Sequence, residues 1–501
     1  MQEDLNKKIG RATKWSSITE IIAKLISPLV NILLARLLDP SAFGAVTTIT
    51  MVISFAEVFT DAGFQKYLIQ HEFSTTEELD RNTNVAFWTN LSFSAFVCVI
   101  IFAFRHGIAN LVGSPNLGNA ISIASISIIL VAFSSIQMAR YKRDLDFKTL
   151  FFVRMGTSLI PVFVTVPLAL IFRNFWALLI GTLASNLFSA VVLTAKSKWK
   201  PKLFYKFSVL KKMLSFSMWS LFESIAVWLT AYVDVFIVGY YLNDHYVGLY
   251  KTSMTMVNSY MAIITAAVVP VLFSALSRVQ NDEKQYRSIY YSFQKITSLL
   301  IIPMGVGLFL FSDIVTYILL GSQWMEASTF IGLWGLMSAI TIIYSHFNGE
   351  VYRSRGEPNV SLFAQIVHLV FLIPVIMISV RYGFESLYIA RSVVRLQGVL
   401  VSFLIICIRY KFKFIDIIKN TLPAIICSLI MGAAGYVMKM LMDGILWQFV
   451  CIAVCIVVYF AALFMLFPKT RREILNYPIV RKFLKTKAKE GQVEDNQKHQ
   501  G

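Results

Sequence analysis

Apolar and polar segments alternate along the whole chain at the length that a lipid bilayer requires. A helix of about 20 apolar residues crosses a hydrocarbon core about 30 Å thick, and runs of that length recur from one end of the chain to the other. Short polar connections separate them. The pattern predicts about fourteen transmembrane helices, at residues 15–38, 43–61, 83–104, 118–139, 150–172, 175–195, 214–240, 247–275, 289–311, 325–346, 359–379, 385–408, 416–438 and 446–467.

The first predicted helical hairpin recurs in the second half of the chain. One apolar helix ends at Arg36, the chain turns at Asp39-Pro40-Ser41, and apolar residues restart at Phe43-Gly44. Pro does not continue a helix, and Ser41 can cap the next one. The segment from Ile237 repeats this pattern and aligns Gly44 with Gly248, an offset of 204 residues. We therefore expect an all-α membrane protein with two pseudo-symmetric six-helix lobes and two further C-terminal helices.

A basic connection separates the two expected lobes. Residues 196–212 contain seven Lys and fall where the repeat restarts, and we expect them to lie against anionic lipid head groups. A second pair of similar segments supports the duplication, because Tyr141-Lys142-Arg143 follows the fourth span and Tyr352-Arg353-Ser354-Arg355 follows the tenth. The predicted units are an N-terminal lobe with its linker (1–208), a C-terminal lobe (209–412), two appended helices (413–468) and a basic, then polar, cytoplasmic tail (469–501).

Composition and charge agree with a membrane protein. The chain is 57% hydrophobic and 15% charged, against about 25% charged residues in soluble domains. Its net charge of +18 does not indicate nucleic-acid binding, because the cations lie in short loops between spans. With the N-terminus placed inside, the inner segments hold 34 Lys and Arg, whereas the outer loops hold only Arg105, Arg173, Arg381 and Lys439. This excess predicts that both termini are cytoplasmic.

The first two predicted helices of each half carry polar stripes at helical spacing. Polar side chains within a bilayer are costly, so we expect these faces to point into the bundle and to line a hydrophilic cavity between the lobes. The stripes consist of Glu20, Lys24, Ser27 and Asn31; Thr47, Thr50, Ser54, Glu57 and Asp61; Ser220, Glu223, Thr230 and Asp234; and Lys251, Thr255, Asn258 and Thr265.

Charged residues inside the predicted spans are the candidate functional residues. Cations can bind an anionic head group through charge-assisted hydrogen bonds, and acids can bind a coupling proton or sodium ion. The candidate substrate-binding cations are Lys24, Arg36, Arg154, Lys251, Lys295, Arg391 and Arg395, and the candidate ion-coupling acids are Glu20, Glu57, Asp61, Glu223 and Asp234.

Structural roles compete with these assignments. Glu20 and Lys24 are spaced to neutralise each other, and Arg36 and Arg154 can extend their side chains to the membrane surface. Glu57 and Asp61 can act as helix caps or ion-pair partners, and we expect His368 to be a hydrogen-bonded interior residue.

No catalytic motif is present. The chain has no Gly-Lys-Ser/Thr phosphate loop, no GxSxG, no HExxH and no CxxC. Its longest outer loops, 105–117 and 312–324, are too short for a catalytic domain. We expect a protein that is not an enzyme and has no cofactor, metal site or disulfide, with packing roles for Cys98, Cys407, Cys427, Cys451 and Cys455.

Several motifs resemble a known family. LARLLDPSAFG at residues 34–44, followed by Asp61-Ala-Gly63 and Leu68, resembles the polysaccharide transporter (Wzx-type flippase) family of the multidrug/oligosaccharidyl-lipid/polysaccharide exporter superfamily. Ala139–Arg143 with Phe147-Lys148 is similar to the segment after the fourth span in that family. Within the family, the chain is most similar to the colanic-acid and teichuronic-acid exporters.

The resemblance implies a flippase in the bacterial cytoplasmic membrane. Such a protein moves undecaprenyl-pyrophosphate-linked oligosaccharide to the outer leaflet by ion-coupled alternating access. Its partners would be that substrate, membrane lipids and the polysaccharide polymerase machinery, with no nucleic acid. The alternatives are a multidrug or cation exporter, a lipid II flippase, a membrane-embedded polymerase or acyltransferase, and a channel.

Overall fold

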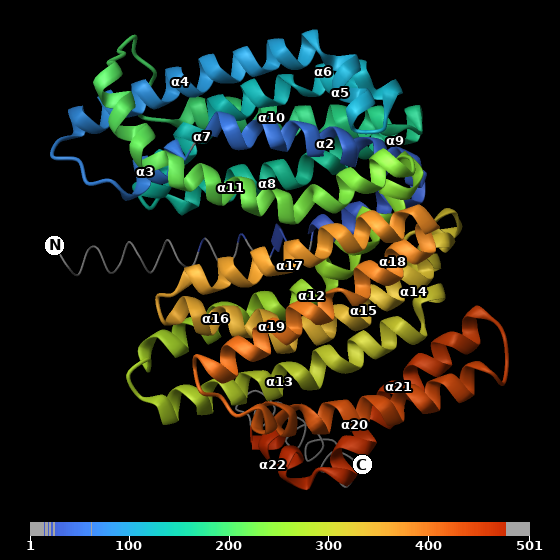
Figure 1. Ribbon diagram of the computed structural model, residues 1–501. Helices are drawn as coiled ribbons and strands as arrows, with labels where there is room; N and C mark the ends of the chain where they lie inside the picture. Colours follow the sequence, from blue (N-terminus) through green and yellow to red (C-terminus); the bar gives the residue numbers. More distant parts are fainter. Residues whose placement is uncertain (1–14, 16–18, 20–21, 24–25, 62, 477–501) are drawn as a thin grey trace, which may run out of the picture.

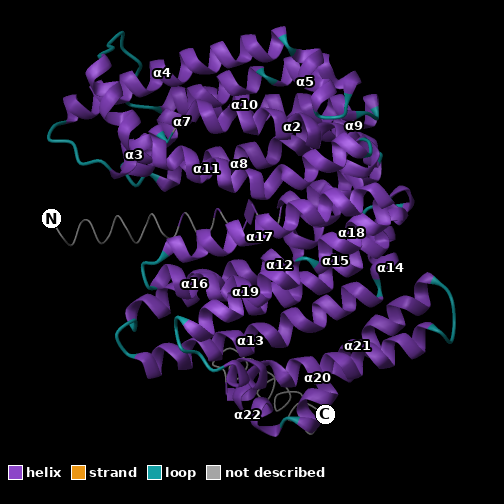
Figure 2. Ribbon diagram, in the orientation of Figure 1, coloured by secondary structure: helices purple, strands orange, loops and turns teal. Residues whose placement is uncertain are grey.

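The computed structural model describes residues 15, 19, 22–23, 26–61 and 63–476. This part of the chain is helical and contains no strand (Figures 1 and 2). By length and composition, 13 of its helices can cross a membrane, and Ile26–Leu37 forms a shorter apolar helix. The prediction of about fourteen spans is confirmed. The first predicted span, 15–38, lies partly outside the described residues.

The N-terminal half forms the upper bundle in Figure 1, in which α7 packs between α4 and α10. Pro161 opens a π-helical turn that joins α8 to α9, as expected where Pro interrupts a helix. After the helix Ile26–Leu37, the elements are α2 (Pro40–Asp61), α3 (Phe64–Gln70), α4 (Thr76–Ala103), α5 (Arg105–Leu111), η1 (Pro115–Leu117), α6 (Gly118–Ala124), α7 (Ile126–Arg143), α8 (Phe147–Ile160), η2 (Pro161–Thr165), α9 (Val166–Phe172) and α10 (Phe175–Lys196).

The C-terminal half begins with α11 (Phe207–Tyr241), which lies along the upper bundle in Figure 1 and packs on α2 and α3. The rest of this half forms the lower bundle, in which α12 packs on α13, α15 and α16. The elements of the lower bundle are α12 (Asp244–Arg278), α13 (Glu283–Leu310), α14 (Ser312–Leu319), η3 (Ser322–Ala327), α15 (Ser328–Thr341), η4 (Ile342–His346), α16 (Phe347–Ser354), α17 (Pro358–Ser379), η5 (Val380–Tyr382), α18 (Phe384–Val393) and α19 (Arg395–Ile408), followed by α20 (Phe414–Lys439), α21 (Ile445–Leu466) and α22 (Pro468–Asn476).

The two related hairpins begin their second helices in the same way. Asp39 Oδ1 accepts a hydrogen bond from Ala42 N at 2.8 Å, and Asn243 Oδ1 accepts one from Tyr246 N at 3.2 Å. The residue before each helix is therefore its cap. The predicted cap at Ser41 is wrong, because α2 already begins at Pro40 and places Ser41 inside the helix.

The appended helices pack on one helix of the C-terminal half. In Figure 1, α20 and α21 lie at the edge of the lower bundle, beside α13. Cys427, Cys451 and Cys455 are buried in the apolar cluster that joins α20 and α21 to α13, and they form no disulfide. Tyr459 Oη donates to Leu299 O of α13 at 2.8 Å.

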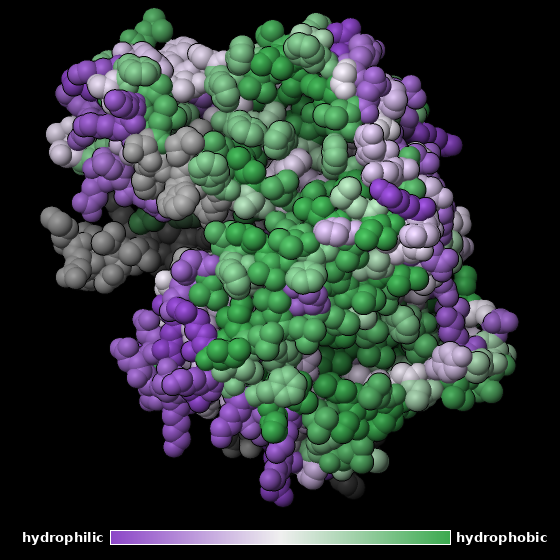
Figure 3. All heavy atoms as spheres, in the orientation of Figure 1, coloured by the Kyte–Doolittle hydropathy of each residue, from purple (hydrophilic) through white to green (hydrophobic). Residues whose placement is uncertain are grey.

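The surface shows a broad apolar band between two polar ends (Figure 3). The end on the left in Figures 1 and 3 carries the Lys- and Arg-rich connections 140–148, 196–206, 278–287, 353–355 and 409–413. We call this the basic end. The loops 104–117 and 311–324 lie at the other end, which we call the opposite end.

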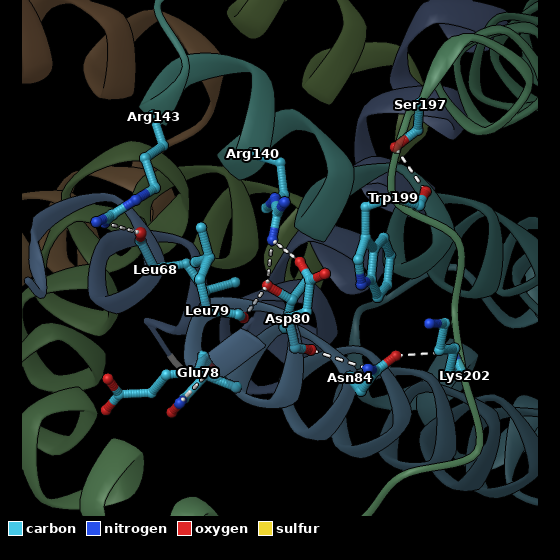
Figure 4. Close-up of polar contacts among 12 residues, drawn as sticks. Leu68, Glu78, Leu79, Asp80, Asn84, Arg140, Arg143, Ser197, Trp199 and Lys202 are labelled. Atoms are coloured by element: carbon cyan, nitrogen blue, oxygen red, sulfur yellow. Dashed lines mark hydrogen bonds and ion pairs between the residues drawn. The ribbon is translucent and has the colours of Figure 1, made fainter. Parts of the chain in front are cut away.

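The basic linker is fixed to the N-terminal half at the basic end (Figure 4). Lys202 N donates to Asn84 Oδ1 of α4 at 2.8 Å, and Trp88 Nε1 donates to Lys202 O at 2.9 Å. Trp199 is buried in an apolar cluster with Phe87 of α4, whereas the Lys198 and Lys206 side chains are exposed. The linker therefore packs on protein through its backbone and Trp199 and leaves lysines free to contact lipid head groups.

The arginine motifs after the fourth and tenth spans make equivalent contacts. Arg143 donates to Leu68 O of α3 at 2.8 Å and to His71 O, in the connection before α4, at 2.7 Å. Arg355 donates to Gln280 O at 3.0 Å, in the connection before α13. In each half, the arginine after the fourth span binds the segment that connects the second span to the third. The similarity of the two sequence segments therefore reflects a shared structural role. The unit boundaries at 208, 412 and 468 stay predictions.

Candidate functional site

Hydrogen bonds join the two halves at the opposite end. Asp244 Oδ1, at the start of α12, accepts from Ser114 Oγ at 2.6 Å and from Thr48 Oγ1 at 3.4 Å. Trp324 Nε1 of η3 donates to Ala35 O at 2.8 Å, and Trp324 is fully buried. These contacts connect elements that are far apart in the sequence, and they close the opposite end between the halves.

A cavity of about 930 Å³ lies on the inner face of the N-terminal half. Its wall is formed by the helix Ile26–Leu37, α2, α7, α8, η2 and α10, with α11 and α12 contributing from the C-terminal half. The polar residues that line it are Thr19, Ser27, Asn31, Thr47, Thr50, Ser134, Lys142, Arg154, Thr157, Ser158, Thr165, Thr182, Ser185, Asn186, Ser189, Tyr232 and Lys251. Such a volume accommodates a small molecule or a polar head group.

The charged side chains among the described lining residues are all cationic. They are Lys142 near the basic end, Arg154 on α8 and Lys251 on α12. The Lys251 Nζ donates to Ala231 O at 3.0 Å and lies 4.7 Å from the ring centroid of Tyr232. Cations together with hydroxyl and amide groups suit a ligand that is both anionic and rich in hydrogen-bonding groups.

A smaller cavity of about 200 Å³ continues the first one between the halves. Both cavities are lined by Asn31, Phe43, Thr47 and Lys251, and the smaller one adds Thr252, Thr255 and Ser259 of α12. The polar stripes predicted for the first, second and eighth spans thus supply Ser27, Asn31, Thr47, Thr50, Lys251 and Thr255 to one continuous polar space.

The cavity extends from the basic end almost to the closed opposite end. Its lining includes Lys142, at the basic end of α7, and Lys251. Lys251 lies seven residues after Asp244 along α12, which is about 10 Å at the helical rise. The contacts of Asp244 therefore separate the deepest part of the cavity from the opposite end.

Asp234 and Arg391 do not line this cavity but form a buried cluster in the C-terminal half. Arg391 Nε donates to Asp234 Oδ2 at 3.0 Å and to Tyr250 Oη at 3.1 Å, and Tyr250 Oη donates to Asp234 Oδ2 at 2.9 Å. Asp234 is 1% exposed and Arg391 is 7% exposed. The cluster links α11, α12 and α18, and the carboxylate already has a cation as its partner.

Arg395 lies beside this cluster on an aromatic ring. Its guanidinium carbon is 4.0 Å from the ring centroid of Trp334, and that of Arg391 is 5.0 Å from the same ring. Arg395 Nη1 also donates to Ser338 Oγ at 2.7 Å. Trp334 thus contacts two cations inside the C-terminal half and stabilises both by cation–π contact.

Two further predicted cations lie elsewhere. Arg36 donates to the carbonyl of Ile318 at the opposite end. Lys295 Nζ lies 2.6 Å from Glu473 Oε2, in a groove at the basic end outside the central cavity. The structure therefore brings together Arg154 and Lys251 in one cavity, and Arg391 and Arg395 in another cluster.

The remaining candidates are only partly described. Glu20 and Lys24 lie outside the described residues, and the side chains of Asp61 and Glu223 are likewise not described. Glu57 is half-buried on α2. His368 Nδ1 lies 3.1 Å from Gln397 Oε1, the interior hydrogen bond expected for it.

Part of the cavity wall comes from helices that the sequence interpretation did not single out. Thr182, Ser185, Asn186 and Ser189 face the cavity from α10. Their spacing of three, one and three residues places them on one helical face. This stripe carries no charge, but its helical periodicity is visible in the sequence.

Comparison with known proteins identifies relatives across most of the chain. A family model described as "Polysaccharide biosynthesis protein" matches residues 33–329. The succinoglycan biosynthesis transport protein ExoT of Rhizobium meliloti is 25% identical over 68% of each chain. The lipopolysaccharide biosynthesis protein WzxC of Escherichia coli is 21% identical over 75% of each chain. The teichuronic acid biosynthesis protein TuaB of Bacillus subtilis is 19% identical over 72% of this chain and 74% of its own.

Solved structures show the same fold. The lipid II flippase MurJ in an inward closed conformation matches with a TM-score of 0.72 and 17% identity, over 89% of this chain and 97% of its own. An inward-facing multidrug resistance MATE family transporter matches with a TM-score of 0.59 and 14% identity, over 78% of this chain and 96% of its own. At these identities the likeness establishes the fold alone.

Proposed function

Because the chain belongs to the polysaccharide biosynthesis protein family of the multidrug/oligosaccharidyl-lipid/polysaccharide exporter superfamily, we propose that it is a flippase for undecaprenyl-pyrophosphate-linked oligosaccharide. The observation that carries this proposal is the cavity of about 930 Å³ whose described charged lining residues are Lys142, Arg154 and Lys251. Its relatives include a Haloferax volcanii protein named "Probable low-salt glycan biosynthesis flippase Agl15", which is 24% identical over 36% of this chain and 39% of its own.

The chemistry of the cavity supports a head group with two parts. Arg154 and Lys251 can bind a pyrophosphate through charge-assisted hydrogen bonds. The hydroxyl and amide groups of α8 and α10 can bind sugar hydroxyls, as donors and as acceptors. A cationic drug would be repelled by the same residues, so the cavity favours the glycolipid over a multidrug or cation exporter.

The asymmetry of the two ends supports alternating access. With the basic end in the cytoplasm, as the distribution of Lys and Arg favours, the cavity faces inward and the contacts of Asp244 close the outer side. Rocking of one half against the other would break those contacts and expose the cavity outside. We place the protein in the bacterial cytoplasmic membrane, with ion coupling through one of the candidate acids.

The test asks which leaflet holds the glycolipid. In a deletion strain, an impermeant glycan probe is applied to intact and permeabilised cells, with complementation by wild type, Arg154→Gln and Arg278→Gln. Arg278 is an exposed arginine of α12 and is the matched control. We expect inner-leaflet glycolipid that wild type and Arg278→Gln clear and Arg154→Gln does not. Glycolipid that reaches the outer leaflet without the protein would contradict a flippase and favour an enzyme that acts after translocation.

Lipid II carries the same pyrophosphate, so the cavity alone does not separate the two substrates. Expression in a strain depleted of its lipid II flippase distinguishes them. Restored growth would favour lipid II, whereas a protein that clears the glycolipid in its own deletion strain but does not restore growth here supports the oligosaccharide.

A further inference from the structure

A second polar groove, of about 810 Å³, opens at the basic end between α13, α20 and α22. It lies where the appended part of the chain meets the C-terminal half, so the internal repeat has no equivalent of it. Lys284, Arg287, Ser288, Ser292 and Lys295 line it from α13. Their helical spacing places all five on one face of that helix.

The Lys284 ammonium and one N–H group of Arg287 remain available for a ligand in this groove. Glu283 lies 2.5 Å from Arg355 Nη2, and Glu473 lies 2.6 Å from Lys295 Nζ, so both acids already have partners. Lys284 is exposed and makes no ion pair with any described residue. Arg287 Nη2 lies 3.5 Å from Glu283 Oε2, but Arg287 Nε is buried and has no hydrogen-bond partner in the described part of the chain. An unpaired guanidinium N–H and a free ammonium form an incomplete anion site.

The character of the groove changes along α13. Lys284 and Arg287 line it near the start of the helix, and Ile296 and Leu299 line its inner part farther along the helix, beside the ion pair of Lys295 with Glu473. From Lys284 to Leu299 the helix rises about 22 Å, since each residue adds about 1.5 Å. That length equals about one leaflet with its head groups, because a whole bilayer measures about 40–45 Å.

We propose that this groove binds an anionic membrane lipid. Lys284 and Arg287 hold its phosphate by charge-assisted hydrogen bonds, Ser288 adds a hydroxyl donor, and an acyl chain lies along Ile296 and Leu299. The bound lipid would join α13 to α20 and α22. A soluble phosphate shares the head-group chemistry but gains nothing from the apolar inner part.

The test measures lipid binding to the full chain purified in detergent. Thermal unfolding is followed with phosphatidylglycerol, phosphatidylcholine or inorganic pyrophosphate added, and native mass spectrometry counts the retained lipids. Lys284→Ala/Arg287→Gln removes the two phosphate donors and leaves the ion pair of Lys295 with Glu473 intact. The single variant Lys284→Ala changes only an exposed side chain, so it gives a result even if the double variant does not fold.

The matched control is Lys211→Ala/Arg81→Gln at the same end. Arg81 matches Arg287 in two contacts. Each arginine pairs with a glutamate four residues before it, Glu77 for Arg81 and Glu283 for Arg287. Each also lies over a phenylalanine ring, with the guanidinium carbon 5.8 Å from the ring centroid of Phe204 for Arg81 and 5.6 Å from that of Phe412 for Arg287.

We expect phosphatidylglycerol to stabilise the wild type and the control. We expect the double variant to bind it more than about tenfold more weakly, and Lys284→Ala to bind it more weakly than the wild type. Equal binding by the groove variants, or equal stabilisation by phosphatidylcholine, would overturn the proposal. Equal stabilisation by pyrophosphate would assign the groove to a soluble anion and would overturn the lipid assignment.

Discussion

Gly44 and Gly248, which the sequence repeat aligns, face each other across the interface between the two halves. A Cβ on Gly44 would lie 1.6 Å from the Asp244 carbonyl oxygen, and a Cβ on Gly248 would lie 1.8 Å from the Pro40 carbonyl oxygen. Each glycine meets the first residue of the other helix, which is the reciprocal contact of a two-fold axis. The pseudo-two-fold axis that relates the two hairpins therefore passes between Gly44 and Gly248, at the closed opposite end.

Gly44→Ala should destabilise the closed state, although Ala favours helices by about 1 kcal/mol over Gly. The added methyl collides with backbone atoms, so α2 and α12 must separate. We expect a lower melting temperature of the purified protein and reduced export. Gly307→Ala is the control, because a Cβ there meets nothing within 4 Å in α13. Equal melting temperatures for the two variants would refute the close-packing argument.

Breaking the ion pair of Asp234 with Arg391 should be costly. Asp234→Asn leaves a buried guanidinium without its charge partner, and such a change costs about 3–5 kcal/mol. We expect Asp234→Asn/Arg391→Gln to lose less stability than the sum of the two single variants, as thermal unfolding of all four proteins can measure. The control Asp313→Asn removes a half-exposed partner of Lys439, and its cost should lie within about 0–1 kcal/mol. A similar loss of stability in Asp234→Asn and Asp313→Asn would contradict the argument that burial makes the first ion pair costly to break.

The loop before α17 should add an acid-sensitive contribution to stability. Glu357 accepts hydrogen bonds from Arg409 at 2.8 and 2.9 Å and from Tyr410, which lower the pKa of its carboxyl from 4.5 to about 2. A depressed folded-state pKa stabilises the protein above the unfolded pKa, and the contribution is lost as the pH falls from about 4.5 towards 2. Glu357→Gln should therefore reduce the drop in melting temperature over this range.

The control for this pH dependence is Glu385→Gln, at an exposed position in the first turn of α18. Its melting profile should keep the acid-dependent drop of the wild type. A drop that is unchanged in Glu357→Gln would show that other carboxylates carry the effect.

Single cysteines should report the orientation of the chain. Lys206→Cys lies at the basic end and Arg173→Cys follows α9 at the opposite end, and both positions are exposed. An impermeant maleimide should label Arg173→Cys in intact cells and Lys206→Cys only after permeabilisation, because the Lys- and Arg-rich end stays in the cytoplasm. The reverse pattern would place the termini outside.

Much of the fold could be predicted because membrane insertion acts on local sequence. Apolar length sets the spans, so the predicted 175–195 corresponds to α10 (Phe175–Lys196) and the predicted 446–467 to α21 (Ile445–Leu466). The family was also recognisable, because its motif at residues 34–44 is one continuous stretch of sequence. The same residues form the hairpin where the two halves meet. The cap at Ser41 was misplaced because Asp39, two residues earlier, takes that role.

The site could be predicted only in part. Helical spacing shows which residues share one face of a helix, but it does not show which other helix packs against that face. Lys251 and Asp234 lie on polar stripes of adjacent spans, yet Lys251 faces the cavity and Asp234 faces Arg391. The partner of a charged face depends on which helix packs against it.

The helical spans, the internal repeat and the resemblance to polysaccharide flippases follow from apolar length and local motifs, so they are readable from the amino-acid sequence. The positions of the charged residues depend on how the helices pack. Packing places Arg154 in the cavity, Arg391 against Asp234 and Lys295 in the groove at the basic end. Burial and pairing of a charge depend on contacts between helices far apart in the chain, which no local pattern encodes.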